Sequence, residues 1–219
     1  VKAFRGDVRD ETLQSQVAGF MSQEAMHTRE HVRYNQRLAE HGYRATLLHE
    51  ETEARFAFAQ KHTTDLQRLA ATCALEHFTA ILAEELLSEP DLLEGAREAY
   101  RDIWLWHAIE EFEHKAVAFD VYQLIGGTER TRVRGMRIAS VILFGELILQ
   151  TALSMAADRA SYNPVTLVRS LHRFSRTPMF TADALRRFRS YNRPGFHPDD
   201  WDSAAVLEHW SKELFDQDG

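Results

Sequence analysis

Apolar residues recur at alternating steps of three and four along most of the chain, which is the period of an amphipathic α-helix. Few glycines or prolines interrupt this pattern before residue 160, so we expect this part of the chain to be almost wholly helical. The predicted helices cover approximately residues 10–41, 45–61, 64–87, 93–125 and 129–160. The pattern therefore predicts an all-α fold in which the helices form a bundle around one core.

The composition changes after residue 160. Four of the five prolines lie in this part of the chain, together with many arginines and aromatic residues. Because proline interrupts helices, we expect short helices in a segment that wraps the bundle rather than extending it. The sequence thus divides into a helical bundle with the candidate chemistry at 1–160 and a C-terminal wrapping segment at 161–219.

Polar residues interrupt three of the apolar stripes. Glu24 and His27 occupy stripe positions in the first predicted helix, with His31 one turn later, and Glu76 lies in the middle of the third stripe. The fourth predicted helix adds His107, Glu110, Glu111 and His114. Residues three and four apart share a helix face, so these side chains should point into one interior. A buried, ionised carboxylate without a partner is costly, and metal coordination is a common reason for several to converge.

The spacing makes the metal interpretation more specific. Glu24 and His27 form a Glu-x-x-His pair, Glu111 and His114 form another, and Glu76 stands alone on a helix between them. In helical bundles that hold two iron or manganese ions, two helices each supply Glu-x-x-His and two others each supply one glutamate. Carboxylates can bridge two cations, and neutral imidazole leaves coordination positions open. These five residues, three of the four expected contributions, are the predicted metal ligands.

Three further polar residues lie close to this set. His31, His107 and Glu110 are candidates either for direct ligation or for orienting a ligand through a hydrogen bond. Strict alternation of three and four places Glu110 in the buried stripe, whereas the Glu-x-x-His spacing selects Glu111. Each glutamate also has a purely structural alternative to metal binding. Glu76 above all could be a core carboxylate whose hydrogen bonds are supplied by an arginine or a tyrosine.

The segments that carry these residues also resemble a bacterial family of predicted metal-dependent hydrolases, assigned to the ferritin-like superfamily. The similar segments cover nearly the whole chain, at residues 23–27, 30–31, 34–35, 74–84, 104–122 and 191–198. The resemblance implies a ferritin-like helical bundle with additional C-terminal helices and a metal site at the residues above. The reaction remains open, because the family's description is itself a prediction.

The resemblance implies one more glutamate, on a helix that precedes Glu24. Asp7, Asp10 and Glu11 are poor substitutes, because Asp10 and Glu11 fit the cap and first turn of the next helix. We therefore expect the missing glutamate to lie upstream of Val1. A chain shortened at its N-terminus would lack one ligand.

Charge and composition limit the partners and the location. A net charge of −7 disfavours nucleic acid, and the lone Cys73 excludes an internal disulfide and fits the cytoplasm. The apolar stretch at 138–157 follows a run of arginines, which is typical of a helix that contacts a membrane. Gly145, Glu146 and Gln150 interrupt it, so we weigh membrane-surface contact against insertion, burial in the bundle and a homodimer interface.

The main functional hypothesis is a di-iron carboxylate enzyme, an oxidase or oxygenase that acts on a small, hydrophobic organic substrate. The alternative is a metal-dependent hydrolase that uses a metal-bound hydroxide as its nucleophile. A third hypothesis is a non-enzymatic metal-binding protein. Two iron ions are the expected cofactor, with manganese and zinc as alternatives, because the same histidine and carboxylate ligands suit all three metals.

Overall fold

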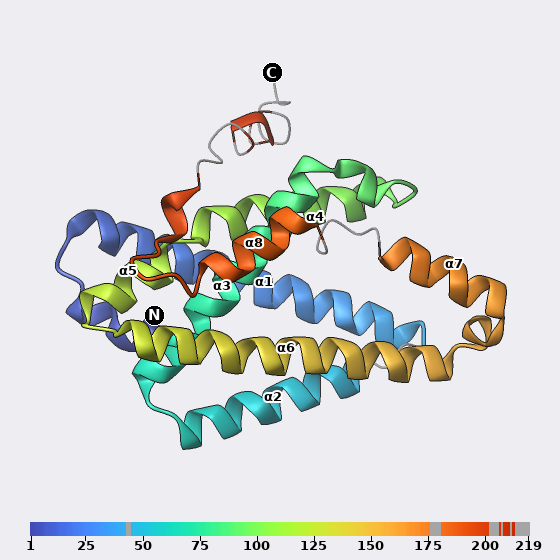
Figure 1. Ribbon diagram of the computed structural model, residues 1–219, viewed down its shortest axis with the longest axis horizontal. Helices are drawn as coiled ribbons and strands as arrows, with labels where there is room; N and C mark the ends of the chain where they lie inside the picture. Colours follow the sequence, from blue (N-terminus) through green and yellow to red (C-terminus); the bar gives the residue numbers. More distant parts are fainter. Residues whose placement is uncertain (43–44, 176–180, 202–205, 207, 211, 213–219) are drawn as a thin grey trace.

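The computed structural model describes residues 1–42, 45–175, 181–201, 206, 208–210 and 212. Over these residues the chain is helical, with short connecting turns and no strand. The predicted all-α class is therefore confirmed. The helices pack chiefly around α3 (Asp65–Ser88), and α4 (Glu98–His114) lies along one side of it, as Figure 1 shows.

The N-terminal helices begin and end where the sequence predicts. A short 3₁₀ helix, Lys2–Asp7, precedes α1 (Glu11–Glu40), and the Asp10 carboxylate accepts a hydrogen bond from the backbone nitrogen of Leu13 at 2.8 Å. Helix α1 ends at Gly42, whose φ of 84° is a left-handed conformation that glycine adopts without strain. After α2 (Ala45–His62), Thr64 and Gln67 form a capping box at the start of α3.

Helix α3 occupies the centre of the molecule and packs against α4, α5 (Val117–Leu124), α6 (Glu129–Ala157) and α8 (Ala182–Ser190). At its contact with α6, a Cβ atom added to Gly135 would lie 3.0 Å from the carbonyl oxygen of Ala70. Glycine at this position therefore allows the two helix backbones to approach closely. This contact belongs to the main apolar core, which α1, α3, α5 and α6 build together.

The prediction of one helix over 93–125 is wrong. The structure has a 3₁₀ turn at Pro90–Leu93, then α4, and then a separate α5 after an interruption at Lys115 and Ala116. Neither residue is a helix breaker. The Lys115 ammonium donates a hydrogen bond to the carbonyl oxygen of Trp201 and pairs with Asp199. The interruption thus coincides with tertiary contacts to the C-terminal segment, which helical periodicity does not reveal.

The C-terminal part contains a 3₁₀ turn (Arg159–Tyr162), α7 (Pro164–Phe174), α8 and a last 3₁₀ turn (Pro198–Asp200). Helix α8 and the residues after it lie against the bundle. Buried Arg132 on α6 donates hydrogen bonds to the carbonyl oxygens of Tyr191 and Arg193, and Arg187 pairs with Glu84 of α3. Helix α7 lies apart from these contacts and packs against the turn that precedes it. The division at residue 160 stays a prediction.

Candidate metal centre

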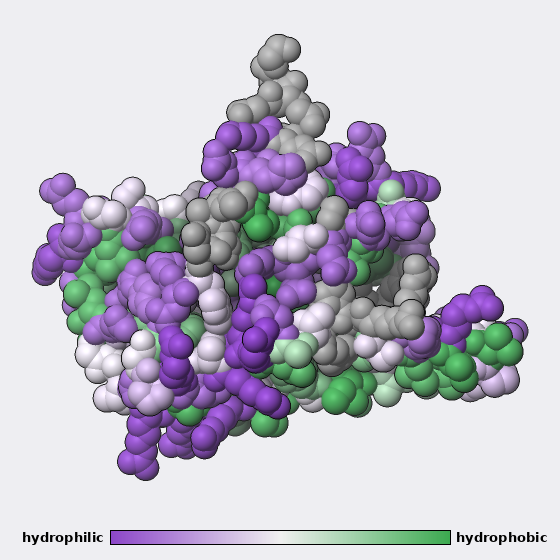
Figure 2. Space-filling view, turned by 45° about the horizontal axis from the view of Figure 1, so that its top comes forward, coloured by the Kyte–Doolittle hydropathy of each residue, from purple (hydrophilic) through white to green (hydrophobic). Residues whose placement is uncertain are grey.

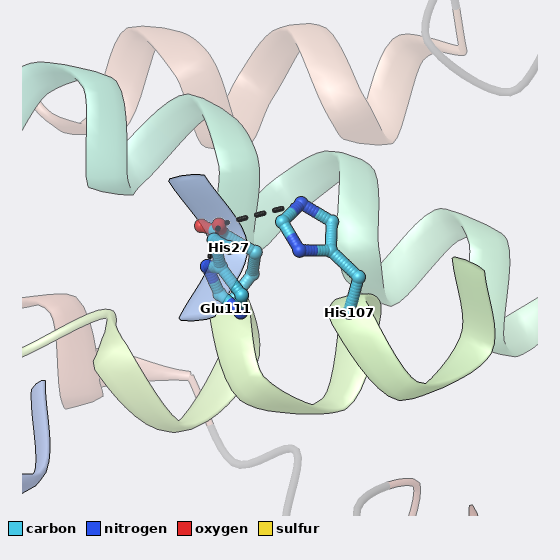
Figure 3. Close-up of side chains that lie close together, drawn as sticks. All are labelled: His27, His107 and Glu111. Atoms are coloured by element: carbon cyan, nitrogen blue, oxygen red, sulfur yellow. Dashed lines mark ion pairs between the residues drawn. The ribbon is translucent and has the colours of Figure 1, made fainter. Parts of the chain in front are cut away.

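Six side chains with metal-binding atoms meet where α1, α3 and α4 pack together. They form two groups, and within each group one nitrogen or carboxylate oxygen per residue lies within 4.8 Å of the others. The first group, shown in Figure 3, contains His27, His107 and Glu111. The second group contains Glu24, Glu76 and His114. The five predicted ligands are thus brought together with His107, although their role as ligands stays a prediction.

Helical spacing places each group. Glu24 and His27 lie one turn apart on α1, while His107, Glu111 and His114 follow one another at four and three residues along α4. Residues at these spacings share a helix face, so α1 and α4 present two matching rows of donors to each other. Helix α3 contributes Glu76 from the third side.

In the first group, Glu111 lies between two imidazole rings. Its Oε1 atom is 3.4 Å from Nδ1 of His27 and 3.5 Å from Nε2 of His107. These distances exceed those of good hydrogen bonds, and His27 Nδ1 is buried without a hydrogen-bond partner among the described residues. The three donors therefore face one another with room between them, as a cation site requires.

The other nitrogen of His27 is occupied. Nε2 lies 2.8 Å from Oε2 of Glu110, so the ring donates its Nε2 hydrogen to this carboxylate and presents Nδ1 to Glu24 and Glu111. A carboxylate that fixes the ring orientation of a ligating histidine is a common arrangement around metals. The geometry thus separates the two neighbouring glutamates: Glu111 lies in the donor group, and Glu110 orients His27.

His114 is oriented in the same way. Its Nε2 atom lies 2.5 Å from the side-chain oxygen of Gln23, and Nδ1 faces Oε1 of Glu24 at 3.2 Å. The sequence pattern did not single out Gln23, because it is an ordinary polar residue beside the apolar stripe. Its only signal is its place directly before Glu24. With Nε2 turned to Gln23 or to Glu110, Nδ1 is the nitrogen that each Glu-x-x-His histidine directs to the centre.

Glu76 is the most costly residue of the centre in the absence of a cation. Its side chain is buried, and Oε2 has no hydrogen-bond partner among the described residues. Burial, followed by repulsion from Glu111 and Glu24, raises the pKa of Glu76 to about 9. No arginine or tyrosine holds this carboxylate in the part of the chain that the structure describes, so the plain alternative of a satisfied core glutamate finds no support.

The remaining groups show how protons balance the carboxylates. Burial opposes ionisation of Glu24, yet the neighbouring imidazoles of His114 and His27 lower its pKa to about 2. Burial likewise opposes a charge on His27, but its carboxylate neighbours Glu111, Glu24 and Glu110 raise its pKa to about 10. Burial lowers the pKa of His107 to about 4. A proton on His27 thus lies between carboxylates where a metal ion would otherwise balance their charge.

These observations meet the requirements of a two-metal site. A buried carboxylate oxygen and a buried imidazole nitrogen lack hydrogen-bond partners among the described residues, and the six donors divide into two adjoining sets of three. Mixed carboxylate and imidazole ligands suit iron, manganese and zinc. The residues present therefore fit the predicted metal pair, while the donors alone do not select the metal.

Beside the first group lies a pocket with an empty volume of about 330 Å³. Its walls include His27, His107, Tyr34, Trp104 and Trp106. The predicted candidate His31 is also in this wall. Its ring packs edge-to-face on His107 with 5.2 Å between ring centroids, and it belongs to neither donor group. The pocket gives a mostly aromatic space access to the first donor group.

The aspartates before α1 contribute nothing to either group. Asp10 caps α1, as predicted, and Asp7 ends the first 3₁₀ turn. Within the described residues, no carboxylate takes the place of the glutamate expected before Glu24.

Helix-borne carboxylates and histidines at two adjoining positions define an all-α metal-binding protein. Residues 1–202 match the family model described as predicted metal-dependent hydrolase, and the chain belongs to this family. Neither the curated proteins nor the solved structures contain a significant match. The family supports an enzyme that depends on a metal. Membership of the ferritin-like superfamily and the identity of the metal stay predictions.

Proposed function

We propose that this protein is a two-metal carboxylate enzyme that oxidises a small, hydrophobic organic substrate with dioxygen at a pair of iron ions. The observation that carries the proposal is the joint placement of two Glu-x-x-His pairs and a buried third glutamate on three packed helices. These are three of the four helix contributions found in the ferritin-like di-iron and di-manganese carboxylate proteins. The substrate and an external electron donor would supply the electrons that reduce dioxygen to water.

The chain's own residues prepare the centre for this role. Glu110 and Gln23 hold the Nε2 hydrogens of His27 and His114, so that both rings keep one orientation and offer Nδ1. Glu24, Glu76 and Glu111 supply three carboxylates, enough to offset most of the charge of two divalent cations. When bound, an iron pair would supply redox chemistry and a zinc pair only Lewis acidity.

The pocket supports a small substrate with an apolar body. Two tryptophans, a tyrosine and Ile103 form half of its lining residues and would exclude water from the apolar part of a bound molecule. His31 and Glu30 are its polar wall residues away from the donor groups. A substrate in this pocket would lie against His107 and His27. His31 would exchange a proton with the part of the substrate that faces away from the metal centre.

Hydrolysis is the second candidate, and the family description is the observation that favours it. The same donors would then serve zinc or manganese, and dioxygen would have no part. In this alternative, His31 in the pocket wall would move a proton at the leaving group.

Metal-exchanged protein distinguishes the two candidates. Iron-loaded protein should consume dioxygen and change its absorption when dioxygen is added to the ferrous form. Zinc-loaded protein should consume no dioxygen, because zinc has no accessible redox step. If the centre is built for oxidation, the zinc form should also hydrolyse p-nitrophenyl acetate and butyrate under nitrogen no faster than His114→Ala does. Anaerobic ester hydrolysis by the zinc form that His114→Ala abolishes would favour the hydrolase. Oxidation with many irons accumulating per chain would indicate metal storage.

A further inference from the structure

Helix α6 carries an exposed apolar stripe on the side away from α3. The stripe contains Ile138, Val141, Ile142, Ile148 and Leu149, spaced so that they share one face. Val141 is 75% exposed and Ile148 is 70% exposed, and Gly145 between them borders open space. By length and composition α6 could cross a membrane, and only 6% of its most apolar window is buried. A soluble helix of this kind normally buries its apolar face.

Helix α7 repeats this feature at the end of α6. Its apolar residues Val165, Val168, Leu171 and Phe174 are each at least half exposed, while Thr166, Arg169 and Ser170 form its polar side. Tyr162, in the turn between the two helices, is 71% exposed. In Figure 2, apolar surface extends toward the end of the molecule where Figure 1 places the distal part of α6 and α7. We call these exposed residues of α6 and α7 the α6–α7 face.

Arginines accompany this face at both ends. Arg130, Arg134 and Arg137 are exposed and continue the α6 stripe in the N-terminal direction, and Arg159 and Arg169 lie at its other end. Residues 130–174 contain seven arginines, of which Arg132 is buried, and two acidic residues in a chain whose net charge is −7. The positive charge is thus concentrated where the exposed apolar surface lies, a combination that favours anionic lipid headgroups.

We propose that the α6–α7 face docks on the surface of an anionic phospholipid membrane. The exposed apolar side chains would enter the boundary between headgroups and acyl chains, with the arginines against phosphates and carboxylates of the lipids. Amphipathic helices with basic polar sides bind bilayers in this way. This inference is independent of the reaction that the metal centre catalyses.

The contacts of α6 argue against a membrane span. Its other side packs on α3, where Met136 and Ala139 are buried, and Arg132 is tied to the carbonyl oxygens of Tyr191 and Arg193. Glu146 in the apolar stretch pairs with Arg55 of α2 at 2.5 Å. Lipid could not surround α6 without breaking these contacts, so the helix can lie on a membrane but not cross it in this fold.

Charge also argues against a second copy of this chain as the occupant. Because arginines lie at both ends of the face, a symmetric pair would bring arginines against arginines whether the two α6 helices ran parallel or antiparallel. Anionic lipid removes this repulsion, whereas a second copy creates it.

Flotation of the full chain with vesicles tests the proposal. We expect binding to phosphatidylcholine vesicles that contain phosphatidylserine, weak binding to pure phosphatidylcholine, and release by high salt. Ile148→Glu combined with Val168→Glu should abolish binding, and Arg137→Gln combined with Arg169→Gln should weaken it roughly thirtyfold. Leu124→Glu is the matched control. Leu124 is 51% exposed on α5, a helix that Figure 1 places far from α7, and its variant should bind like the unchanged protein.

The alternatives give different results. Absence of flotation with anionic vesicles, or equal loss in Leu124→Glu, overturns the proposal. A dimer in lipid-free buffer that Val168→Glu dissociates overturns it in favour of a second copy. Protein that high salt and alkali leave in the membrane, and that only detergent releases, overturns it in favour of a span. Circular dichroism of each variant shows that the fold is kept, as expected for side chains that lie on the surface.

Discussion

At the scale of single residues, the centre is a set of charges that the metal-free protein must balance with protons. Glu76 is held neutral by burial and by Glu111 and Glu24, whereas His27 is held charged by the carboxylates around it. Both residues therefore bind a proton in the folded protein at pH values where they would have lost it in the unfolded chain. A metal ion would displace these protons, so metal affinity should rise with pH.

This balance predicts how the stability of the metal-free protein depends on pH. Between the ordinary value of 4.5 and about 9 for Glu76, and between 6.5 and about 10 for His27, the folded state binds more protons than the unfolded state. The free energy of unfolding should therefore fall as pH rises from about 6.5 to 9. His107 and Glu24, whose pKa values are lowered to about 4 and about 2, act only below this window.

Glu76→Gln tests this account of the pH dependence. The amide keeps the shape and cannot ionise, so the melting temperature of the metal-free variant should fall less steeply between pH 6.5 and 9 than that of the unchanged protein. The variant should also lose the stabilisation by added metal that mass action gives the unchanged protein. Identical pH profiles would show that Glu76 is not the titrating group, and a large loss of helix content would mark it as a structural residue.

Much of the residue-level picture was accessible from sequence, for a physical reason. Polar residues in an apolar helical stripe must be paired, and spacings of three and four state which of them share a face, so Glu24, His27, Glu76 and His114 could be expected together. Whether Glu110 or Glu111 enters the centre depends on the rotation of α4 against α1, which spacing along one helix does not contain. The role of Gln23 depends on the same contact, and its one sequence signal is its place directly before Glu24.

At the scale of elements, helix ends that are marked by capping residues or glycine were predictable from the sequence. A helix break that coincides with contacts to a distant segment was not. Asp10, Thr64 and Gly42 mark boundaries through their own backbone and capping chemistry. The break between α4 and α5 has no such residue and occurs where Lys115 contacts the segment around Trp201. Periodicity predicts a continuous helix there because it registers only contacts within the helix.

Two glycines on α6 test how closely that helix packs. A Cβ at Gly135 would lie 3.0 Å from backbone and side-chain atoms of Ala70, whereas one at Gly145 would meet no atom within 4 Å. Gly135→Ala should lower the free energy of unfolding by about 1–3 kcal/mol, because the backbone of α3 must move. Gly145→Ala should raise it by about 0.5–1 kcal/mol, because alanine favours the helix and nothing obstructs it.

Chemical denaturation of both variants provides the measurement. Equal changes at the two positions would contradict the close approach of α6 to α3, and with it the placement of the α6 stripe on the outer side of the helix. A difference of the expected sign would support both.

At the scale of the whole molecule, the fold separates two tasks. Helices α1, α3 and α4 bring six donors into a buried centre beside an aromatic pocket, while α6 and α7 present basic and apolar surface on the outside. The sequence indicated the first task through convergent polar residues. The sequence did not settle the role of α6, because an apolar stretch has the same composition whether it lies in the core, in a dimer interface or on a membrane. Only the packing of α6 against α3 shows which face of the helix is left exposed.

The central claim is that the six donors hold two metal ions, and anomalous diffraction from crystals of the protein grown with manganese tests it most directly. The account predicts two peaks about 3.5–4 Å apart. One should lie among His27, His107 and Glu111, and the other among Glu24, Glu76 and His114, with Nδ1 of His27 and His114 facing the peaks. Occupied peaks elsewhere in the molecule, with neither donor group holding metal, would contradict it.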